Sequence, residues 1–259
     1  MGNETIRHLC GLSGGKDSAA LAIYLRDKVP NMEYFFCDTG YELPEVYEFL
    51  NRLEAYLGKP IVRLDNGGRD FEHYLVIKHG YLPSPQNRWC TEVLKLRPME
   101  LFIGHDKAIN YVALRADENR EGYTSKKPNI KSRFPFIEDG LTIIDIHRIL
   151  DSVSLGLPKY YEWRSRSGCF FCFYQRKIEW IRLFKLHPDL FKKAVAFEEF
   201  AYKLRQNKGQ DYKFSWLGDE LLIDMVKPER MNQIIEECKL GVETNDKKEK
   251  SSLLVDIFK

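Results

Sequence analysis

The sequence predicts an α/β protein with a doubly wound, mainly parallel sheet and a helical extension at its carboxyl end. Two observations lead to this fold class. Up to about residue 140, short apolar runs alternate with helical segments, which is typical of parallel strands covered by helices on both faces. From residue 141 onward the segments are helical and the alternation stops. We therefore expect a main domain over residues 1–140 and a helical extension over 141–259, with a charged tail from about residue 241.

Three apolar runs alternate with three helical segments in the first 80 residues. The runs predict strands at 5–12, 33–40 and 60–65. The helical spacing of apolar side chains indicates a first helix at 18–29. A second helix should begin at Pro44, because proline is tolerated in a first helical turn, and stop at Gly58. A third helix is predicted at 70–80.

The alternation of apolar runs with helical segments is less regular between residues 81 and 136. Prolines and a Trp-Cys pair predict a loop over the carboxyl edge of the sheet at 81–99, leading into a helical segment. Residues 110–123 predict a further strand with a polar exit. The basic, proline-bearing stretch at 124–136 is expected to be a mobile connection.

Composition and charge exclude several classes of protein. An apolar content of 44% indicates a folded globular chain, and no apolar run approaches the roughly 20 residues that span a bilayer. A formal net charge of only +2 means that any contact with nucleic acid rests on a local basic patch. Six cysteines without a signal peptide argue against a disulfide scaffold and for reduced thiols in a cytoplasmic protein.

The first predicted strand is joined to the first helix by Ser13-Gly14-Gly15-Lys16-Asp17-Ser18. A glycine-rich turn at this position presents main-chain N–H groups to an anion, and the positive end of the helix dipole adds to the attraction. The loop therefore predicts a phosphate site. It departs from the Walker A loop, because Cys10 stands where the first glycine belongs and Asp17 replaces the hydroxyl residue that holds magnesium.

This loop resembles the PP-loop of the ATP pyrophosphatases in the adenine nucleotide alpha-hydrolase superfamily. The resemblance implies that the loop cradles the pyrophosphate of ATP while the alpha-phosphate is attacked. Lys16 and Asp17 would be catalytic, with Lys16 balancing the phosphate charge and Asp17 supporting the loop or Mg²⁺. The residues implied to line the pyrophosphate are Ser13, Gly14, Gly15 and Ser18.

Further stretches, up to about residue 180, resemble the phosphoadenosine phosphosulfate reductase-like branch of that superfamily. In the first, Asp38, Thr39 and Gly40 match a strand end that would contact the nucleotide at the carboxyl edge of the sheet. A plain helix cap is the alternative for this stretch. In the second, Lys95 would contact phosphate or substrate, with Arg88 close to it.

The third stretch, residues 113–123, implies a further phosphate contact. Arg115 would be the third catalytic residue and would grip the alpha-phosphate with Arg120, because guanidinium groups suit phosphate geometry. Ala113 replaces the glycine usual in the family, which is a mild departure.

The fourth stretch contains Cys169 and Cys172 in a Cys-x-x-Cys pair. In cluster-bearing members of the branch, two adjacent upstream cysteines complete the ligand set. Here Cys90 keeps the first position and Thr91 takes the second. The three thiolates would hold a [4Fe-4S] cluster with one open iron, and Cys37 is a candidate fourth ligand. Persulfide-carrying, redox, inert and zinc-bound cysteines remain open as alternatives.

A reductase of this branch cleaves an already activated sulfate, so it need not keep the complete pyrophosphate loop that this chain has. The reductases also carry a Glu-Cys-Gly-His-like motif near the carboxyl end, and no histidine follows Cys238 here. With the cysteine trio beside the loop, the chain most resembles enzymes that exchange oxygen for sulfur in nucleic acids, notably the ATP pyrophosphatase component of bacterial DNA phosphorothioation systems.

That resemblance implies adenylation of a DNA backbone phosphate, release of pyrophosphate and replacement of oxygen by sulfur. A cysteine desulfurase would donate the sulfur, and other subunits of the modification system would be partners. Three alternatives remain: a tRNA thiolation enzyme, a phosphoadenosine phosphosulfate reductase, and a non-catalytic nucleotide-binding subunit.

Contact with nucleic acid, DNA rather than tRNA, is expected at two stretches. In the first, aromatic side chains that stack on bases alternate with charges that neutralise phosphate. Its residues are Tyr160, Tyr161, Trp163, Arg164, Arg166, Tyr174, Arg176 and Lys177. The second supplies Lys126, Lys127, Lys131 and Arg133. The alternatives are that the aromatic side chains pack in a core and that the basic loop is simply solvated. Cys10 and Cys238 are expected to be buried as small apolar residues.

Overall fold

The computed structural model describes residues 6–218 and 220–241. These residues form two compact units. Unit 1 contains residues 6–68 and 91–159, and unit 2 contains residues 69–90 and the described residues from 160 onward. Each unit thus takes two separate stretches of the chain, whereas the sequence-based division has one boundary, after residue 140.

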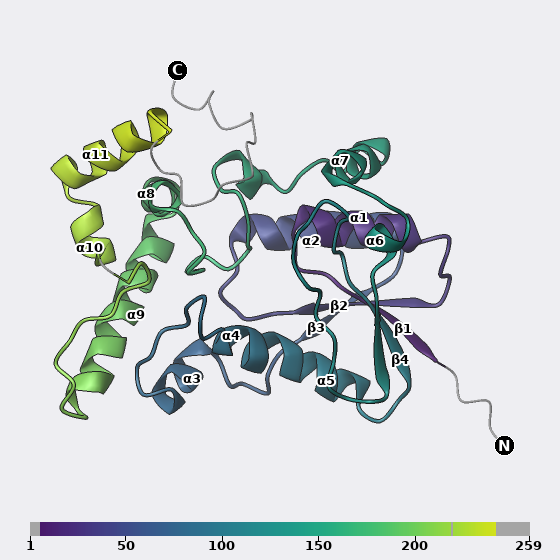
Figure 1. Ribbon diagram of the computed structural model, residues 1–259, viewed down its shortest axis with the longest axis horizontal. Coiled ribbons are helices and arrows are strands. Elements are labelled where there is room, and N and C mark those ends of the chain that lie inside the picture. Colours follow the sequence, from purple (N-terminus) through teal and green to yellow (C-terminus); the bar gives the residue numbers. More distant parts are fainter. Residues whose placement is uncertain (1–5, 219, 242–259) are drawn as a thin grey trace. The chain divides into compact units, whose positions relative to one another are not determined.

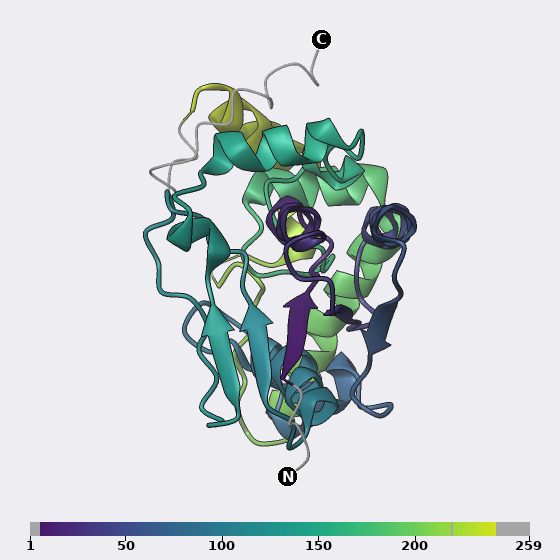
Figure 2. The ribbon, with the colours of Figure 1, turned by 90° about the vertical axis from the view of Figure 1, so that its right-hand side faces the viewer.

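Unit 1 is built on a five-stranded sheet in which all strands are parallel, in the order β3-β2-β1-β4-β5. Figure 2 shows the strands side by side. The strands are β1 (Arg7–Gly11), β2 (Met32–Cys37), β3 (Ile61–Leu64), β4 (Ala108–Tyr111) and β5 (Ile130–Arg133). In the register, Leu9 of β1 lies opposite Glu33 of β2 and Asn110 of β4. The predicted α/β class with a parallel sheet is confirmed.

Strand β5 corrects the expectation of a mobile connection at 124–136. Ile130 is buried in the sheet core, whereas Lys131 and Arg133 are exposed. A four-residue strand at the sheet edge with one apolar side chain directed inward carries almost no periodic signal, so composition alone indicated a loop.

Helices cover both faces of this sheet, as Figure 1 shows. One face carries α1 (Lys16–Leu25) and α2 (Pro44–Leu57), and α7 (Ile143–Ser152) packs on α1. The other face carries the π-helical segment η1 (Glu92–Leu96) and α5 (Arg97–Ile103). The short α6 (Pro135–Glu138) follows β5. Helix α2 begins at Pro44 as predicted, and Gly58 caps it in the left-handed region at φ 63°.

The sheet core beneath α5 is apolar. Its buried side chains are Leu9, Phe35, Met99, Ile103, Ala108 and Ile130. On the opposite face, α1 buries Ala19, Ala20, Leu21, Ala22 and Leu25. Removal of these side chains from water fixes α1 and α5 against the strand ends that form the site.

Unit 2 is helical, which confirms the expected carboxyl-terminal helices. Its helices are α3 (Phe71–Ile77), α8 (Lys177–Leu186), α9 (Pro188–Gln206), α10 (Leu222–Met225) and α11 (Pro228–Lys239). The short α4 (Trp89–Thr91) and η2 (Lys159–Glu162) lie where the chain passes between the units. Among the described residues, no helix combines the length and apolar character needed to cross a membrane.

An aromatic cluster holds unit 2 together. The Phe71 ring lies 4.3 Å from that of Phe171 and 5.0 Å from that of Trp89, measured between centroids. Phe171 also stacks on Trp216 at 5.1 Å. Because Phe171 lies between Cys169 and Cys172, the Cys-x-x-Cys turn is anchored by an apolar side chain in the core of this unit.

Candidate active site

The loop between β1 and α1 is closed by Ser18. Its hydroxyl accepts a hydrogen bond from the Ser13 main-chain N–H at 3.1 Å and donates one to the Gly15 carbonyl at 3.2 Å. The Ser13 hydroxyl lies 3.1 Å from the same oxygen. Ser18 is buried and Ser13 is exposed, so the loop has a fixed inner side and a polar outer side at the start of a helix.

Gly14 is required by both conformation and space. Its φ is +70°, in the left-handed region, and a Cβ atom there would lie 2.4 Å from Cγ1 of Val46 in α2. The loop can therefore lie against α2 only with glycine at this position.

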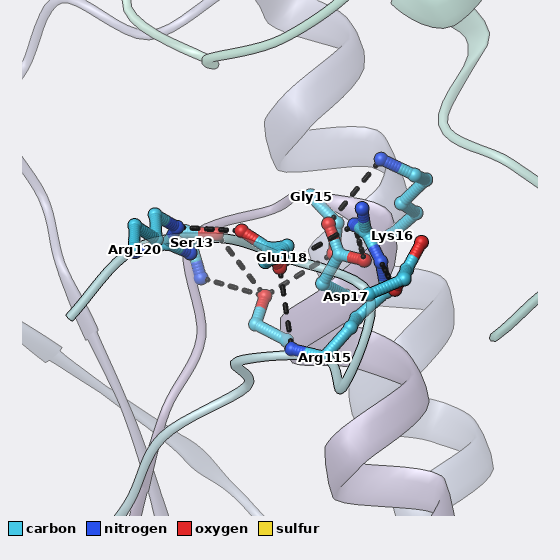
Figure 3. Close-up of polar contacts among 9 residues, drawn as sticks. Ser13, Gly15, Lys16, Asp17, Arg115, Glu118 and Arg120 are labelled. Atoms are coloured by element: carbon cyan, nitrogen blue, oxygen red, sulfur yellow. Dashed lines mark hydrogen bonds and ion pairs between the residues drawn. The ribbon is translucent and has the colours of Figure 1, made fainter. Parts of the chain in front are cut away.

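Asp17 is held by two cationic side chains, which Figure 3 shows. Arg115 Nη1 lies 2.8 Å from Asp17 Oδ1, and Lys16 Nζ lies 3.3 Å from Asp17 Oδ2. Arg115 Nε also binds Asp117 at 2.9 Å, and Nη1 lies 3.5 Å from Glu118 Oε1. Burial by itself would lower the pKa of Arg115, but the three nearby carboxylates raise it by more, so the pKa lies above its usual value. Arg115 is thus permanently charged, and its ion pair with Asp17 links the segment after β4 to α1.

A cavity of about 350 Å³ opens at the carboxyl ends of β1, β2 and β4. This is the position at which the strand order reverses, where open parallel sheets bind ligands. Its polar wall contains Ser13, Asp17, Ser18, Lys95, Asn110 and Arg120. Its apolar and aromatic wall includes Phe35, Phe36, Met99, Tyr111 and Tyr123. One cavity therefore offers apolar surface for a flat ring beside cations and hydroxyls suited to phosphates.

Several predicted site residues line this cavity. Ser13, Asp17, Ser18 and Lys95 do so, together with Arg120 and Cys37. Gly14, Gly15 and Lys16 form the loop behind this wall without being among the lining residues. Arg115 is also outside the lining set, since its guanidinium group is directed at Asp17 and its neighbours. Its contact with the alpha-phosphate stays a prediction.

The stretch Asp38-Thr39-Gly40 organises the start of α2. Asp38 Oδ1 accepts hydrogen bonds from the Gly40 N–H at 2.9 Å and from the Tyr47 hydroxyl at 2.8 Å. Thr39 donates to Glu42 at 3.0 Å. These three residues are absent from the lining set, so their contact with a nucleotide also stays a prediction.

Sequence reasoning did not identify the aromatic wall. The sequence places Phe35 and Phe36 in the apolar run at 33–40 and Tyr111 in the strand predicted at 110–123, without indicating that they face a ligand. The available signal was their position, because each lies within two residues of the carboxyl end of a parallel strand. The Tyr111 hydroxyl is hydrogen bonded to His8 Nδ1 at 2.9 Å, which fixes its ring at the cavity.

The residues do not fit a ready-made metal centre. Across 6–218 and 220–241, no group of three or more His, Cys, Asp or Glu side chains is arranged to hold an ion. Cys90, Cys169 and Cys172 all belong to unit 2, but they are not assembled into a ligand set, and Cys37 belongs to unit 1. Both oxygens of Asp17 contact cationic side chains, and its contact with Mg²⁺ stays a prediction.

The first expected nucleic-acid stretch is partly buried. Tyr160, Trp163 and Arg164 belong to the core of unit 2, and Arg164 is fully buried, donating to the Cys169 carbonyl at 2.7 Å. Because these three residues are buried, they cannot form a surface patch. Arg166 remains exposed, with its guanidinium group 4.7 Å from the centroid of the Tyr174 ring.

Ion pairs engage other members of the two basic stretches. Arg176 binds Glu179 and Lys177 binds Glu220. In the second stretch, Arg133 binds Glu138, whereas Lys126 and Lys131 are exposed.

Two further cysteine predictions have different outcomes. Cys10 is buried in β1, as predicted. Cys238 lies in α11 but is only half-buried, so its predicted burial is wrong. It lies near the end of an amphipathic helix whose buried residue is Ile234.

Comparison with known proteins gives one family match. Residues 7–139, more than half of the chain, match the family described as phosphoadenosine phosphosulfate reductase domain. Two curated relatives are uncharacterized proteins of Methanocaldococcus jannaschii, 28% identical over 200 residues and 26% identical over 222 residues. Those matches cover 73% and 80% of this chain but 47% and 45% of the relatives, so the chain spans about half their length.

Among solved structures, a crystal structure of phosphoadenylyl-sulfate (PAPS) reductase from Candida auris in complex with phosphate aligns with a TM-score of 0.47. The sequences are 13% identical, and the alignment covers 64% of this chain and 82% of that chain.

Proposed function

Since this chain belongs to the phosphoadenosine phosphosulfate reductase domain family, we propose that it is an ATP pyrophosphatase that adenylates an oxygen of a DNA backbone phosphate. Pyrophosphate leaves, and sulfur then replaces the oxygen, as in DNA phosphorothioate modification. The observation that carries the proposal is the complete Ser13–Ser18 loop at the wall of a cavity that also contains Lys95 and Arg120.

The cavity has the two chemical surfaces that ATP requires. The adenine ring would lie against the aromatic wall, which includes Phe36 and Tyr111. The triphosphate would extend toward Ser13 and the amino end of α1, where main-chain N–H groups and the helix dipole attract anions. Mg²⁺ would arrive with the phosphates, because it is commonly held by substrate oxygens and water.

Adenylation of a phosphodiester makes a specific demand on the enzyme. The attacking oxygen is already anionic at neutral pH, so no general base is needed. It forms a bond to the alpha-phosphorus as the bond to pyrophosphate breaks, and two anionic groups must be brought together. Lys16, Lys95 and Arg120 would supply the neutralising charge. Asp17 holds Lys16 beside the loop, and Arg115 holds Asp17.

The second half-reaction exchanges oxygen for sulfur. A hydrosulfide equivalent, supplied by a cysteine desulfurase partner, attacks the adenylated target phosphorus. A P–S bond forms, the bond to the AMP oxygen breaks, and AMP leaves with the former target oxygen. Cys90, Cys169 and Cys172 are the proposed residues for handling sulfur, and other subunits of the modification system are the proposed partners.

Product analysis tests the substrate assignment. DNA and tRNA are incubated separately with the protein, MgATP and sodium sulfide, then digested and analysed by mass spectrometry. Phosphorothioate-linked dinucleotides from DNA, with AMP formed in equal amount, are expected. Thionucleosides from tRNA, with unmodified DNA, would contradict the DNA assignment and support tRNA thiolation.

A further inference from the structure

Lys95 reaches the cavity from a π-helical segment. Segment η1 runs from Glu92 to Leu96 and leads directly into α5. Single π-helical turns often occur at functional sites, because the extra residue changes the direction of a side chain and alters the main-chain hydrogen bonding. Here the segment places Lys95 among the lining residues, whereas its neighbour Arg97 is exposed to solvent.

Two side chains from neighbouring strand ends bind the carbonyl groups of this segment. The Cys37 thiol, at the end of β2, donates to the Lys95 carbonyl with a sulfur-to-oxygen distance of 3.2 Å. The Asn66 amide, just after β3, donates to the Val93 carbonyl at 3.0 Å. The carboxyl ends of the strands therefore hold η1 at the carbonyl groups of Val93 and Lys95. The Lys95 side chain also lines the cavity.

The protonation state of Cys37 suits a donor. Burial raises the pKa of its thiol to about 11, although the nearby Lys95 charge and the Met99 main chain oppose the rise. The thiol consequently keeps its proton at neutral pH and remains available to the Lys95 carbonyl.

We propose that Cys37 is a positioning residue, whose thiol holds the main chain of Lys95 so that the Lys95 ammonium group meets the phosphates of the bound nucleotide. This inference rests on the proposed function, because it assigns a nucleotide to the cavity. Cys37 acts through Lys95, because its thiol binds the carbonyl group of that residue.

The test combines a conservative pair of variants with a double-mutant cycle. MgATP affinity is measured by calorimetry for the wild type and for Cys37→Ala, Cys37→Ser, Lys95→Ala and Cys37→Ala/Lys95→Ala. A matched control, Cys238→Ala, makes the same chemical change in unit 2. Loss of one weak hydrogen bond should lower affinity about fivefold in Cys37→Ala, and the serine hydroxyl should restore it to within about twofold.

In the Lys95→Ala background, Cys37→Ala should have no further effect, and Cys238→Ala should bind as the wild type. Unchanged affinity in Cys37→Ala, or an equal fivefold loss without Lys95, would overturn the proposal. Amide hydrogen exchange of the peptide covering residues 92–99 separates this outcome from failure of the proposed function. Faster exchange in Cys37→Ala but not in Cys37→Ser is expected even without nucleotide, whereas unchanged exchange contradicts the positioning role.

Discussion

Arg115 Nη1 donates to Asp17 Oδ1 at 2.8 Å, linking two residues that are 98 positions apart in the chain. The exit of β4 thereby fixes the first turn of α1, which carries Lys16 and the end of the predicted phosphate loop. Arg115 is only 5% exposed and faces three carboxylates. Its observed role is to hold Asp17 in place.

Replacing Arg115 should destabilise unit 1. Arg115→Ala leaves three clustered carboxylates without their buried cation, and we expect the free energy of unfolding to fall by about 3 kcal/mol. Arg115→Lys keeps the charge but loses the forked geometry, so its loss should be intermediate. Urea unfolding should be followed by circular dichroism, because all four tryptophans lie in unit 2. A change below about 1 kcal/mol in Arg115→Ala would contradict this role.

Replacing Arg120 should weaken MgATP binding and leave stability almost unchanged. Its side chain is 58% exposed and pairs with Glu118, so Arg120→Ala should change stability by less than about 1 kcal/mol. The side chain lines the cavity, however, and loss of a charged hydrogen bond to phosphate should weaken MgATP binding at least about tenfold. Calorimetry measures this effect. Wild-type affinity in Arg120→Ala would show that the phosphates bind elsewhere.

Gly14→Ala should disrupt the loop. The new Cβ would lie 2.4 Å from Val46 Cγ1 and would add to the strain of a positive φ. Gly58→Ala is the matched control, because Gly58 has φ +63° but no atom within 4 Å of an added Cβ. We expect Gly14→Ala to abolish measurable MgATP binding. Gly58→Ala should bind normally and lose only about 1 kcal/mol of stability. Equal behaviour of the two variants would show that space near Val46 is unimportant.

Glu198 should make the stability of unit 2 depend on pH. Burial raises the pKa of this carboxyl to about 7, with Asp224 and Glu199 adding to the rise. Its oxygens accept hydrogen bonds from the main-chain N–H groups of Trp216 and Leu222. The folded protein therefore binds a proton more tightly than the unfolded chain, and stability should fall as pH rises from about 4.5 to about 7.

The variant Glu198→Gln isolates this effect, because an amide does not titrate. Urea unfolding followed by tryptophan fluorescence at several pH values should give a flatter profile for the variant than for the wild type over that range. Identical slopes would show that another group causes the dependence.

Local patterns were sufficient to predict most of the framework. The loop 13–18, helix α1 and the limits of α2 follow from glycine, proline and apolar spacing within short stretches, and the structure confirms them. Strand β5 was missed because its stability comes from pairing with β4 and from burial of Ile130, neither of which creates a periodic pattern.

The contacts within the site could not be predicted without the tertiary structure. The contact of Arg115 with Asp17 depends on two distant segments, so the motif alone favoured a phosphate contact. Trp163 and Arg164 show the same limit in unit 2, because their residue types suggested a nucleic-acid surface while packing buries them. The cysteine positions likewise depend on packing, since the buried Phe171 fixes the turn between Cys169 and Cys172.

The central claim is tested most directly by pyrophosphate release from MgATP in the presence of DNA, sulfide and the desulfurase partner. The wild type should release pyrophosphate and AMP in equal amounts, and DNA should stimulate the release. Lys16→Ala should reduce it at least about 100-fold, because the loop loses the charge that balances the leaving group. Release by Lys16→Ala at the wild-type rate, or ADP and inorganic phosphate as the wild-type products, would contradict the ATP pyrophosphatase assignment.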